Sequence, residues 1–173
     1  MKKYISLAAL LLFVATNALA GNSLLKETDI EAVALKLVRE TQEAGYKLLS
    51  VAEVKQMLDA KEDFVLIDAH PLEEYNLAYI AGARHFGFQS HHSGHWEQDV
   101  AMLNKLTQEN YRKVLGADTG KKIIIYCGMT KCGRSHNAAS WAKKLGYTNV
   151  YRMPGGIAAW KDAGYAYKSN LTR

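Results

Sequence analysis

The sequence predicts a single α/β domain in which helices flank a central, mainly parallel sheet. Short apolar runs typical of buried strands occur at residues 64–68, 122–126 and 149–151, and segments with helical spacing of apolar residues alternate with them. The chain has 173 residues and is 49% hydrophobic, which suffices for one domain with a sizeable core. Its two cysteines are too few for a disulfide-rich scaffold.

Residues 1–20 have the pattern of a secretory signal peptide. Lys2 and Lys3 precede a short apolar run, and the segment ends in Ala-Leu-Ala, a small-x-small cleavage pattern. The run is shorter than the ~20 residues that span a bilayer, which disfavours the alternative of an uncleaved anchor. We therefore expect a mature chain from Gly21 in an oxidising compartment, a bacterial periplasm.

The charge balance does not indicate a nucleic-acid-binding protein. Lys and Arg number 22 against 17 Asp and Glu, a formal net charge of +5, and no basic stripe is present. Without Lys2 and Lys3 the counts are 20 against 17. We expect no nucleic-acid partner, and no membrane partner after cleavage of the signal peptide.

A helical extension is expected at residues 21–48, ahead of the main domain at residues 49–168. The segment Thr28–Glu31 is spaced as a capping box, and the apolar residues that follow keep helical spacing to Ala44. Gly45 then ends the pattern.

From residue 49 onward the predicted elements alternate without an internal repeat. Ser50 and Glu53 form a second capping box that begins a short helix, and Pro71 interrupts the chain after a strand that ends in Asp68. The other predicted elements are, in order, a helix at 72–79, a short strand at 82–86, a polar His-rich loop at 88–96, a helical stretch at 97–115 with a break near Thr107, a strand at 122–126, a helix at 137–145, a strand at 149–151 and a last helix from Gly155-Gly156 through Trp160.

Both cysteines lie in one loop, CGMTKCGRS, which follows the strand at 122–126. In an open parallel sheet this is the carboxyl edge, where ligands bind. A thiol there meets backbone N–H groups, the positive end of the next helix, and the cations Lys131 and Arg134. All three favour thiolate over thiol, which a nucleophilic sulfur requires.

Three segments resemble, in order, the hallmark segments of rhodanese-like domains: LIDAHPLEEYNLAYIAGARHFGF, IIIYCGMTKCGRSHNAASWAKKLGYTNVY and MPGGIAAW. The resemblance covers about residues 49–165 and implies a compact α/β domain with a central parallel sheet. It also implies a loop cysteine that accepts sulfane sulfur as a persulfide and passes it to a thiophilic acceptor. By position, Cys127 matches the family's nucleophile, and Arg134-Ser135 and Ala138-Ala139 match the residues that open the next helix.

The loop departs from the family pattern in length. Typical sulfurtransferase members have four residues between the cysteine and the Arg-Ser pair, whereas six lie between Cys127 and Arg134. Cys132 occupies the enlarged loop, and His70 stands where the family often has an arginine. We therefore expect the loop to hold an anion other than thiosulfate, and the spacing also differs from that of the related phosphatases.

A periplasmic subgroup associated with pyrroloquinoline-quinone-dependent catabolism is similar in its two loop cysteines and in a Ser-x-Asn-Ala-Ala stretch, although Gly133 replaces that subgroup's usual tryptophan.

The resemblance and the two thiols lead to a hypothesis of site roles. Cys127 carries the persulfide, Cys132 attacks it as resolving or redox partner, and Arg134 holds an oxyanion. The candidate substrate-binding residues are Gly128, Met129, Thr130, Lys131, Gly133, Ser135, His70 and Asp68. The partners expected are a small sulfur-containing substrate, a thiol acceptor and a periplasmic redox partner.

Other interpretations of the same residues stay open. Cys127 and Cys132 can form a thiol-disulfide redox couple, or a disulfide that merely fixes the loop of a non-catalytic binding module. Asp68 can instead cap a helix or pair with a cation, and His70 can be a wall residue of the site.

The His-rich segment is the candidate for metal binding. His91, His92 and His95 are not accompanied by a cysteine or carboxylate at regular ligand spacing. We therefore expect a surface loop or pocket flap there, with no metal site and no cofactor.

Overall fold

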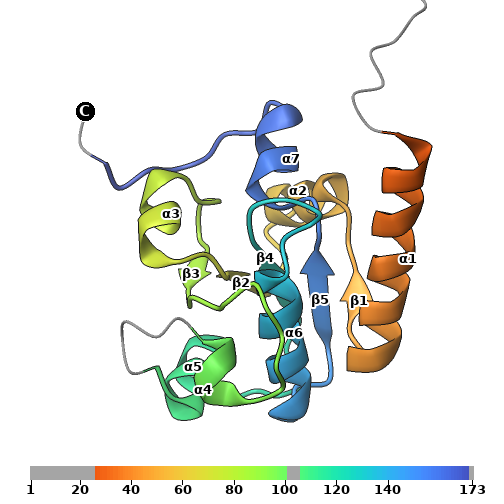
Figure 1. The fold of residues 1–173 in the computed structure, drawn as a ribbon. Coiled ribbons are helices and arrows are strands. Elements are labelled where there is room, and N and C mark those ends of the chain that lie inside the picture. The colour runs from red at the N-terminus through yellow and green to blue at the C-terminus, as the bar shows by residue number, and fades with distance from the viewer. Residues whose placement is uncertain (1–25, 101–105, 172–173) are drawn as a thin grey trace, which may run out of the picture.

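The computed structural model describes residues 26–100 and 106–171. Its five-stranded sheet has the order β1-β5-β4-β2-β3, and all neighbouring strands are parallel. Helices cover both faces of this sheet, as Figure 1 shows, and a helix precedes it. The predicted α/β class is therefore confirmed. The strands are β1 Lys47–Leu48, β2 Val65–Asp68, β3 Arg84–His85, β4 Ile123–Tyr126 and β5 Val150–Met153, and the helices are α1 Glu27–Ala44, α2 Val51–Asp59, α3 Leu72–Leu77, α4 Trp96–Asp99, α5 Gln108–Leu115, α6 Arg134–Lys144 and α7 Gly156–Asp162.

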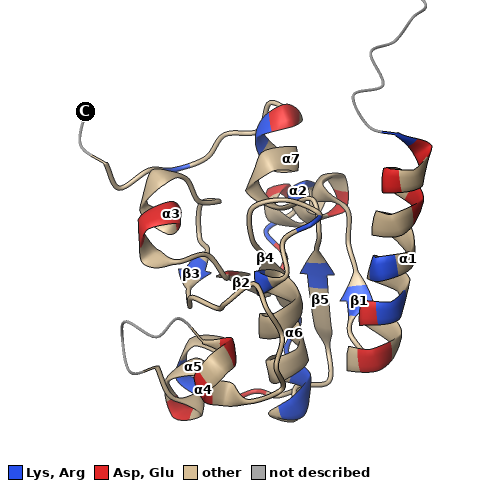
Figure 2. Ribbon diagram, in the orientation of Figure 1, with Lys and Arg blue, Asp and Glu red and all other residues tan. Residues whose placement is uncertain are grey.

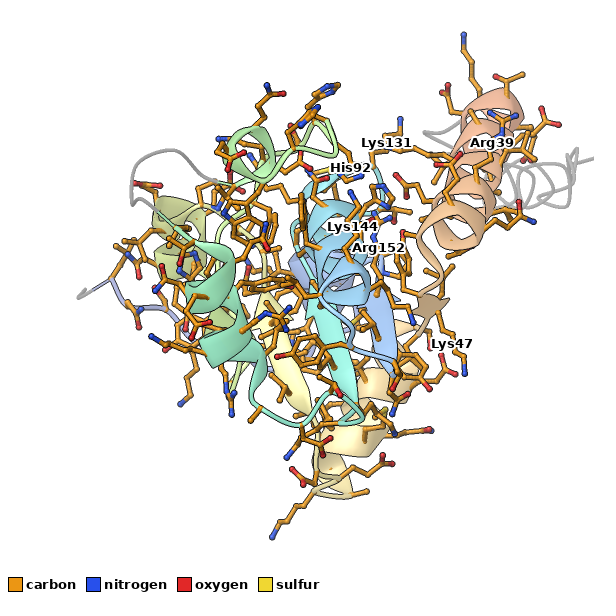
Figure 3. The ribbon with its side chains drawn as sticks, turned by 90° about the horizontal axis from the view of Figure 1, so that it is seen from below. Arg39, Lys47, His92, Lys131, Lys144 and Arg152 are labelled. Atoms are coloured by element: carbon orange, nitrogen blue, oxygen red, sulfur yellow. The ribbon has the colours of Figure 1, made fainter. Side chains whose placement is uncertain are left out.

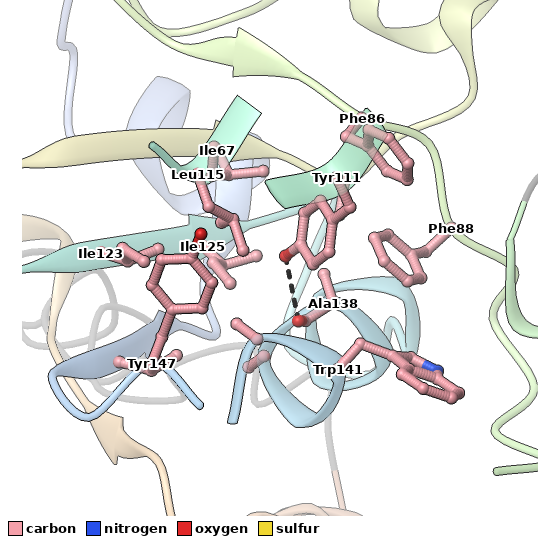
Figure 4. Packing of buried hydrophobic residues seen from close by; sticks show 14 of the residues in the cluster. Ile67, Phe86, Phe88, Tyr111, Leu115, Ile123, Ile125, Ala138, Trp141 and Tyr147 are labelled. Atoms are coloured by element: carbon pink, nitrogen blue, oxygen red, sulfur yellow. Dashed lines mark hydrogen bonds between the residues drawn. The ribbon is translucent and has the colours of Figure 1, made fainter. Parts of the chain in front are cut away.

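The two faces of the sheet bury different side chains of the same strands. On β4, Ile123 and Ile125 join a cluster with α5 and α6, whereas Ile124 and Tyr126 join another with α2 and α7. The alternation arises because successive side chains of a strand point to opposite faces. In the first cluster the Tyr111 hydroxyl donates to a backbone carbonyl of α6 at 3.0 Å (Figure 4). Both faces of the central strands are thus covered, which explains their continuous apolar runs.

Several predicted element boundaries shift by a few residues in the structure, and two of the differences concern the surroundings of the cysteines and the middle of the chain. Helix α6 begins at Arg134 rather than at residue 137, so Arg134 and Ser135 form its first turn. The stretch expected to be helical at 97–115 contains α4 and α5, and α5 is capped by Thr107, at the predicted break. Residues 101–105 lie outside the described residues.

Of the two capping boxes predicted in the N-terminal part of the chain, only one forms. Ser50 and Glu53 form the expected capping box, whereas α1 begins at Glu27 without a side-chain cap, so the box predicted at Thr28 is wrong. Strand β1 was not predicted at all, since two residues carry no periodic signal.

Helix α1 runs along one edge of the molecule, next to β1 and packed on α6 (Figure 1). Most of its residues are exposed, but Glu40 is buried. No helix among residues 26–100 and 106–171 has the length and apolar character needed to cross a bilayer. The predicted signal peptide at residues 1–20 lies outside the described residues.

Candidate functional site

The loop at residues 127–133, the cysteine loop, joins β4 to α6 at the carboxyl edge of the sheet. Cys127 directly follows β4, and Arg134 begins α6. Ligands of open parallel sheets bind at this edge because the strand ends and helix N-termini meet there. The loop therefore lies where the sequence predicted a binding site.

The first half of the cysteine loop is held by the N-terminus of α7. The backbone N–H groups of Ile157 and Ala158 donate to the carbonyl oxygens of Cys127 and Gly128 at 2.8 and 2.9 Å. A Cβ added to Gly156 would lie 2.1 Å from the Cys127 carbonyl oxygen, and Gly156 has a φ of +60°. Only glycine allows this close approach without a shift of backbone.

The His-rich segment covers the far end of the loop. A Cβ on Gly133 would lie 2.0 Å from the carbonyl oxygen of Ser90. The Asn137 side-chain amide donates to the carbonyl oxygens of Gln89 and His91 at 2.8 and 2.7 Å. Because Ser90 occupies the space beside Gly133, this arrangement leaves no room for a side chain there.

Arg152 of β5 holds the second half of the loop through hydrogen bonds to its backbone. It is completely buried, and its Nη2 donates to the carbonyl oxygens of Cys132 at 2.8 Å and Thr130 at 3.5 Å. Its Nε donates to the Ser135 hydroxyl at 2.9 Å. Figure 2 shows this basic position within β5, and in Figure 3 Arg152 lies among the elements of the sheet whereas Lys47 lies at the periphery.

Two residues outside the cysteine loop complete the surroundings of Arg152. Nη1 donates to Glu40 of α1, a buried ion pair, and to the Tyr46 hydroxyl at 3.3 Å. Tyr46 also shares a hydrogen bond of 3.0 Å with Nδ1 of His136. Sequence reasoning missed Arg152, Glu40 and Tyr46; the only signal was a charged residue inside an apolar strand pattern, VYRM.

Cys127 is fully buried and lies among thiol and hydroxyl partners. Burial raises the pKa of its thiol well above the usual value, and the hydrogen bond with Cys132 acts in the same direction. Its Sγ lies 3.1 Å from Ser135 Oγ and 3.7 Å from the Cys132 carbonyl oxygen. Cys127 is therefore held as a thiol at neutral pH.

Cys132 lies in the opposite environment, partly exposed at the surface of the loop. Its pKa is lowered to about 5, first by the hydrogen bond from Cys127, then by the backbone N–H groups of Arg134 and Gly128 and by the Arg134 charge, which together outweigh burial. Arg134 Nη1 also donates to Cys132 Sγ at 3.8 Å. Both cysteines are free, so the structure represents the reduced loop.

Asp68 and His70 lie beside the loop as a buried pair. Asp68 Oδ1 accepts from the His70 backbone N–H at 3.0 Å and lies 2.7 Å from His70 Nδ1. On the other side, His70 Nε2 lies 3.5 Å from Glu74, which also contacts Arg134 Nη2 at 3.3 Å. A Cβ on Gly128 would lie 3.2 Å from His70 Nε2, so this pair forms one wall of the site.

An open depression of about 490 Å³ lies over Cys132. It contains three cationic side chains, Lys36 from α1, Lys131 and Arg134, together with the acidic Glu74. Its other lining residues are Ser90, Gly128, Met129, Cys132 and Gly133. Anions are favoured in such a depression because cationic side chains and a helix N-terminus converge on it.

The structure brings the predicted site residues together at this edge. Met129 is exposed, Lys131 also borders an apolar hollow against α1, and the Thr130 carbonyl faces Arg152. His136, in the first turn of α6, faces Tyr46 and His92, and burial lowers its pKa to about 4.

The His-rich segment is organised around an aspartate. His92 Nδ1 lies 3.0 Å from Asp99, and the Ser93 and Trp141 side chains donate to the same carboxylate at 2.8 and 2.9 Å. Within the part of the chain that the structure describes, no group of three or more His, Cys, Asp or Glu side chains is placed to hold a metal ion.

The fold and the site together define a class: an α/β protein with a parallel sheet whose thiol-bearing loop opens onto a cationic depression. Comparison with known proteins identifies the family. The family model of the rhodanese-like domain matches residues 50–163. This chain therefore belongs to the rhodanese-like domain family, as its motifs predicted.

Several similar proteins are sulfurtransferases. The chain is 30% identical over 124 residues to thiosulfate sulfurtransferase GlpE of Pseudoalteromonas translucida, in a match that covers 72% of this chain and 96% of that protein. The corresponding protein of Shewanella oneidensis is 27% identical, over 69% of this chain and 97% of its own length. A tRNA uridine(34) hydroxylase of Enterococcus faecalis is 33% identical, but the match spans only 36% of it.

Solved structures agree on the fold. The BH2092 protein of Bacillus halodurans superimposes with a TM-score of 0.57 at 19% identity, over 80% of this chain and 88% of that one. The thiosulfate sulfurtransferase of Pseudomonas aeruginosa gives 0.53 at 22% identity, over 77% of this chain and 22% of that one.

Proposed function

We propose that this protein is an exported sulfurtransferase that accepts sulfane sulfur from an anionic donor at Cys132 and releases it with the help of Cys127. The observation that carries the proposal is the division between the two thiols: the Cys132 pKa is lowered to about 5, whereas burial raises that of Cys127. The order of the two cysteines is thus the reverse of the one expected from the position of Cys127 in the family pattern.

The first step is a thiolate displacement. The Cys132 thiolate attacks the sulfane sulfur of the donor, the new S–S bond forms a persulfide, and the donor's remainder departs with the electron pair of the broken bond. With thiosulfate as donor, sulfite departs. Lys36, Lys131 and Arg134 line the depression and stabilise both the arriving and the departing anion.

The persulfide then has two routes. An external thiol acceptor takes the outer sulfur, or Cys127 attacks the inner sulfur of Cys132. In the second route a Cys127–Cys132 disulfide forms, the outer sulfur is reduced to hydrosulfide, and the Cys127 proton leaves with it. A dithiol partner in the same compartment must then reduce the disulfide. The signal-peptide pattern of residues 1–20 supports a periplasmic location for this cycle.

A second candidate function is thiol-disulfide exchange without sulfane sulfur. The closeness of the two cysteines in one loop favours it: both are free, and Cys127 Sγ lies 3.7 Å from the Cys132 carbonyl oxygen. In this case the Cys127/Cys132 couple is the whole activity.

Mass spectrometry after incubation with thiosulfate, and separately with inorganic polysulfide, tests the proposal. The reduced Cys127→Ser variant is expected to gain about 32 Da on the Cys132 peptide, which is one sulfur atom. The reduced Cys132→Ser variant gains none at neutral pH, and the wild type releases hydrosulfide.

Sulfur found on Cys127 in Cys132→Ser, with none on Cys132 in Cys127→Ser, restores the order predicted from the family. Absence of added sulfur in every variant with both donors rejects the transferase function and leaves the exchange function.

A further inference from the structure

We propose that Arg152 is a positioning residue for Cys127, and that helix α1 takes part in the active site through Glu40, the counter-ion of Arg152. The inference rests on the proposed function in one respect: it assigns Arg152 to the step in which Cys127 attacks a sulfur on Cys132.

Every N–H donor of the Arg152 guanidinium has an acceptor. A guanidinium carries five such donors in a rigid fork, and a buried one is costly unless all are paired. The acceptors come from α1, the segment before β1, the cysteine loop and α6: Glu40, Tyr46, Thr130, Cys132 and Ser135. A lysine presents its donors from a single point and cannot reproduce this set.

Two of these five acceptors also contact the Cys127 sulfur. Ser135 Oγ lies 3.1 Å from Cys127 Sγ, and the Cys132 carbonyl oxygen lies 3.7 Å from it. Because Arg152 Nε donates to the Ser135 oxygen, the hydroxyl proton of Ser135 is free to turn toward the sulfur. Because Nη2 draws on the Cys132 oxygen, that carbonyl repels a thiolate less.

Arg152 thus favours negative charge on Cys127 without touching it. This matters only when Cys127 acts as a nucleophile, since its burial otherwise holds the proton. The resolving step, and not the loading of Cys132, is where the arrangement has its effect.

The negative charge of Glu40 partly offsets the electrostatic effect of Arg152 on the Cys127 sulfur. It lies 112 positions from Arg152 in the chain, and it joins α1 to the underside of the cysteine loop. The ionisable groups around this pair are Glu43, Tyr46, His136, the two cysteines and Lys36, which lies 3.6 Å from Glu40. Burial raises the pKa of Tyr46 to about 12 and lowers that of His136 to about 4, so at neutral pH Tyr46 keeps its proton and His136 carries no charge.

The test uses 2,2′-dithiodipyridine, so it does not depend on any sulfur donor. The Cys132 thiolate attacks the reagent and releases one thiopyridone, and Cys127 then attacks the mixed disulfide, forms the Cys127–Cys132 disulfide and releases a second thiopyridone. The second absorbance phase therefore reports the reactivity of Cys127 in the full chain, and Cys127→Ser is expected to lack it.

Two variants are expected to move the pH profile of that phase in opposite directions. Arg152→Lys lacks the forked set of donors of the guanidinium, so we expect the pH profile to move about one pH unit higher. The second phase then slows about tenfold at neutral pH. Glu40→Gln leaves Arg152 in place without its counter-ion, so the profile moves to lower pH. Glu31→Gln, an exposed acid on the same helix, matches the wild type.

A merely structural role of the ion pair slows both variants or neither, and does not give shifts of opposite sign. The inference is overturned if Arg152→Lys, folded by circular dichroism, does not shift upward or if Glu40→Gln does not shift downward. If Arg152→Lys does not fold, the sign of the Glu40→Gln shift decides. A wild type without a second phase also overturns it, whatever the outcome of the sulfur-loading experiment.

Discussion

Cys127 and Cys132 belong to the same short loop, yet their surroundings act on them in opposite directions. Cys127 follows a central strand, and burial raises its pKa; Cys132 lies at the open side of the loop, where hydrogen bonds and the Arg134 charge lower its pKa to about 5. Reactivity in such a loop depends on which sulfur the backbone N–H groups surround, and position in the sequence does not settle that. The same loop thus contains a protonated thiol, Cys127, and a nucleophilic thiolate, Cys132.

The largest expected effect is a loss of stability when the close contact between the Cys127 backbone and the N-terminus of α7 is disrupted. Gly156→Ala places a methyl group about 2.1 Å from the Cys127 carbonyl oxygen, so we expect the free energy of unfolding to fall by about 3 kcal/mol or more. Gly164→Ala is the matched control, because Gly164 has a similar φ of +73° with nothing within 4 Å, and should cost about 1 kcal/mol.

Urea denaturation of the two variants measures this difference. Equal losses of stability in both would show that the close contact behind Cys127 contributes nothing beyond backbone conformation.

A second prediction sharpens the contrast between the thiols themselves. At pH 7 the alkylation rate with iodoacetamide is expected to fall at least about 100-fold in Cys132→Ser, because less than about 1% of a thiol with a pKa above 9 is ionised there. In the wild type the rate should stay high as pH falls and drop only through about pH 5, since the thiolate is the reacting form.

Cys127→Ala is the complementary variant. It removes the hydrogen bond that contributes most to the low pKa of Cys132, so the drop should move to higher pH while the rate at pH 8 stays close to wild type. A wild-type profile centred near pH 9 would contradict the assignment of the thiolate to Cys132.

The smallest expected effect concerns the partly exposed ion pair between Glu74 and Arg134, on the side of the loop that carries Cys132. Glu74 lies 3.3 Å from Arg134 and is 45% exposed, so the pair is worth at most about 1 kcal/mol. Glu74→Gln frees the guanidinium for an anionic donor, and the KM for that donor should fall about two- to fivefold.

Steady-state kinetics of sulfur transfer measure the change, with Glu73→Gln, an exposed neighbour on α3, as control. A KM that rises, or one equal to that of the control, would argue against Arg134 as the group that holds the anion.

Much of the fold follows from local patterns. The apolar runs predict β2, β4 and β5 because central parallel strands are covered on both faces, and the pair Ser50 and Glu53 predicts the start of α2 from local hydrogen bonding. The two-residue β1 was missed because it has no periodic signal, and the start of α1 was misplaced because the capping box expected at Thr28 does not form.

The position of the candidate site is also predictable in part from local patterns. The strand-loop-helix order alone predicts that both cysteines, Lys131 and Arg134 lie at the carboxyl edge of the sheet, and they do. The roles of the two thiols do not follow from that order, because they depend on Ser90, Arg152 and α7, which enclose the loop from other parts of the chain.

By itself the sequence determined the α/β class, the family and the loop that carries the chemistry, since strands, helices and the cysteine spacing are properties of neighbouring residues. Only the tertiary structure decided which sulfur is buried, and only it brought Glu40 to Arg152 across 112 positions of the chain. The physical reason is that a pKa follows the charges, dipoles and solvent within a few ångströms, and folding, not chain order, assembles these.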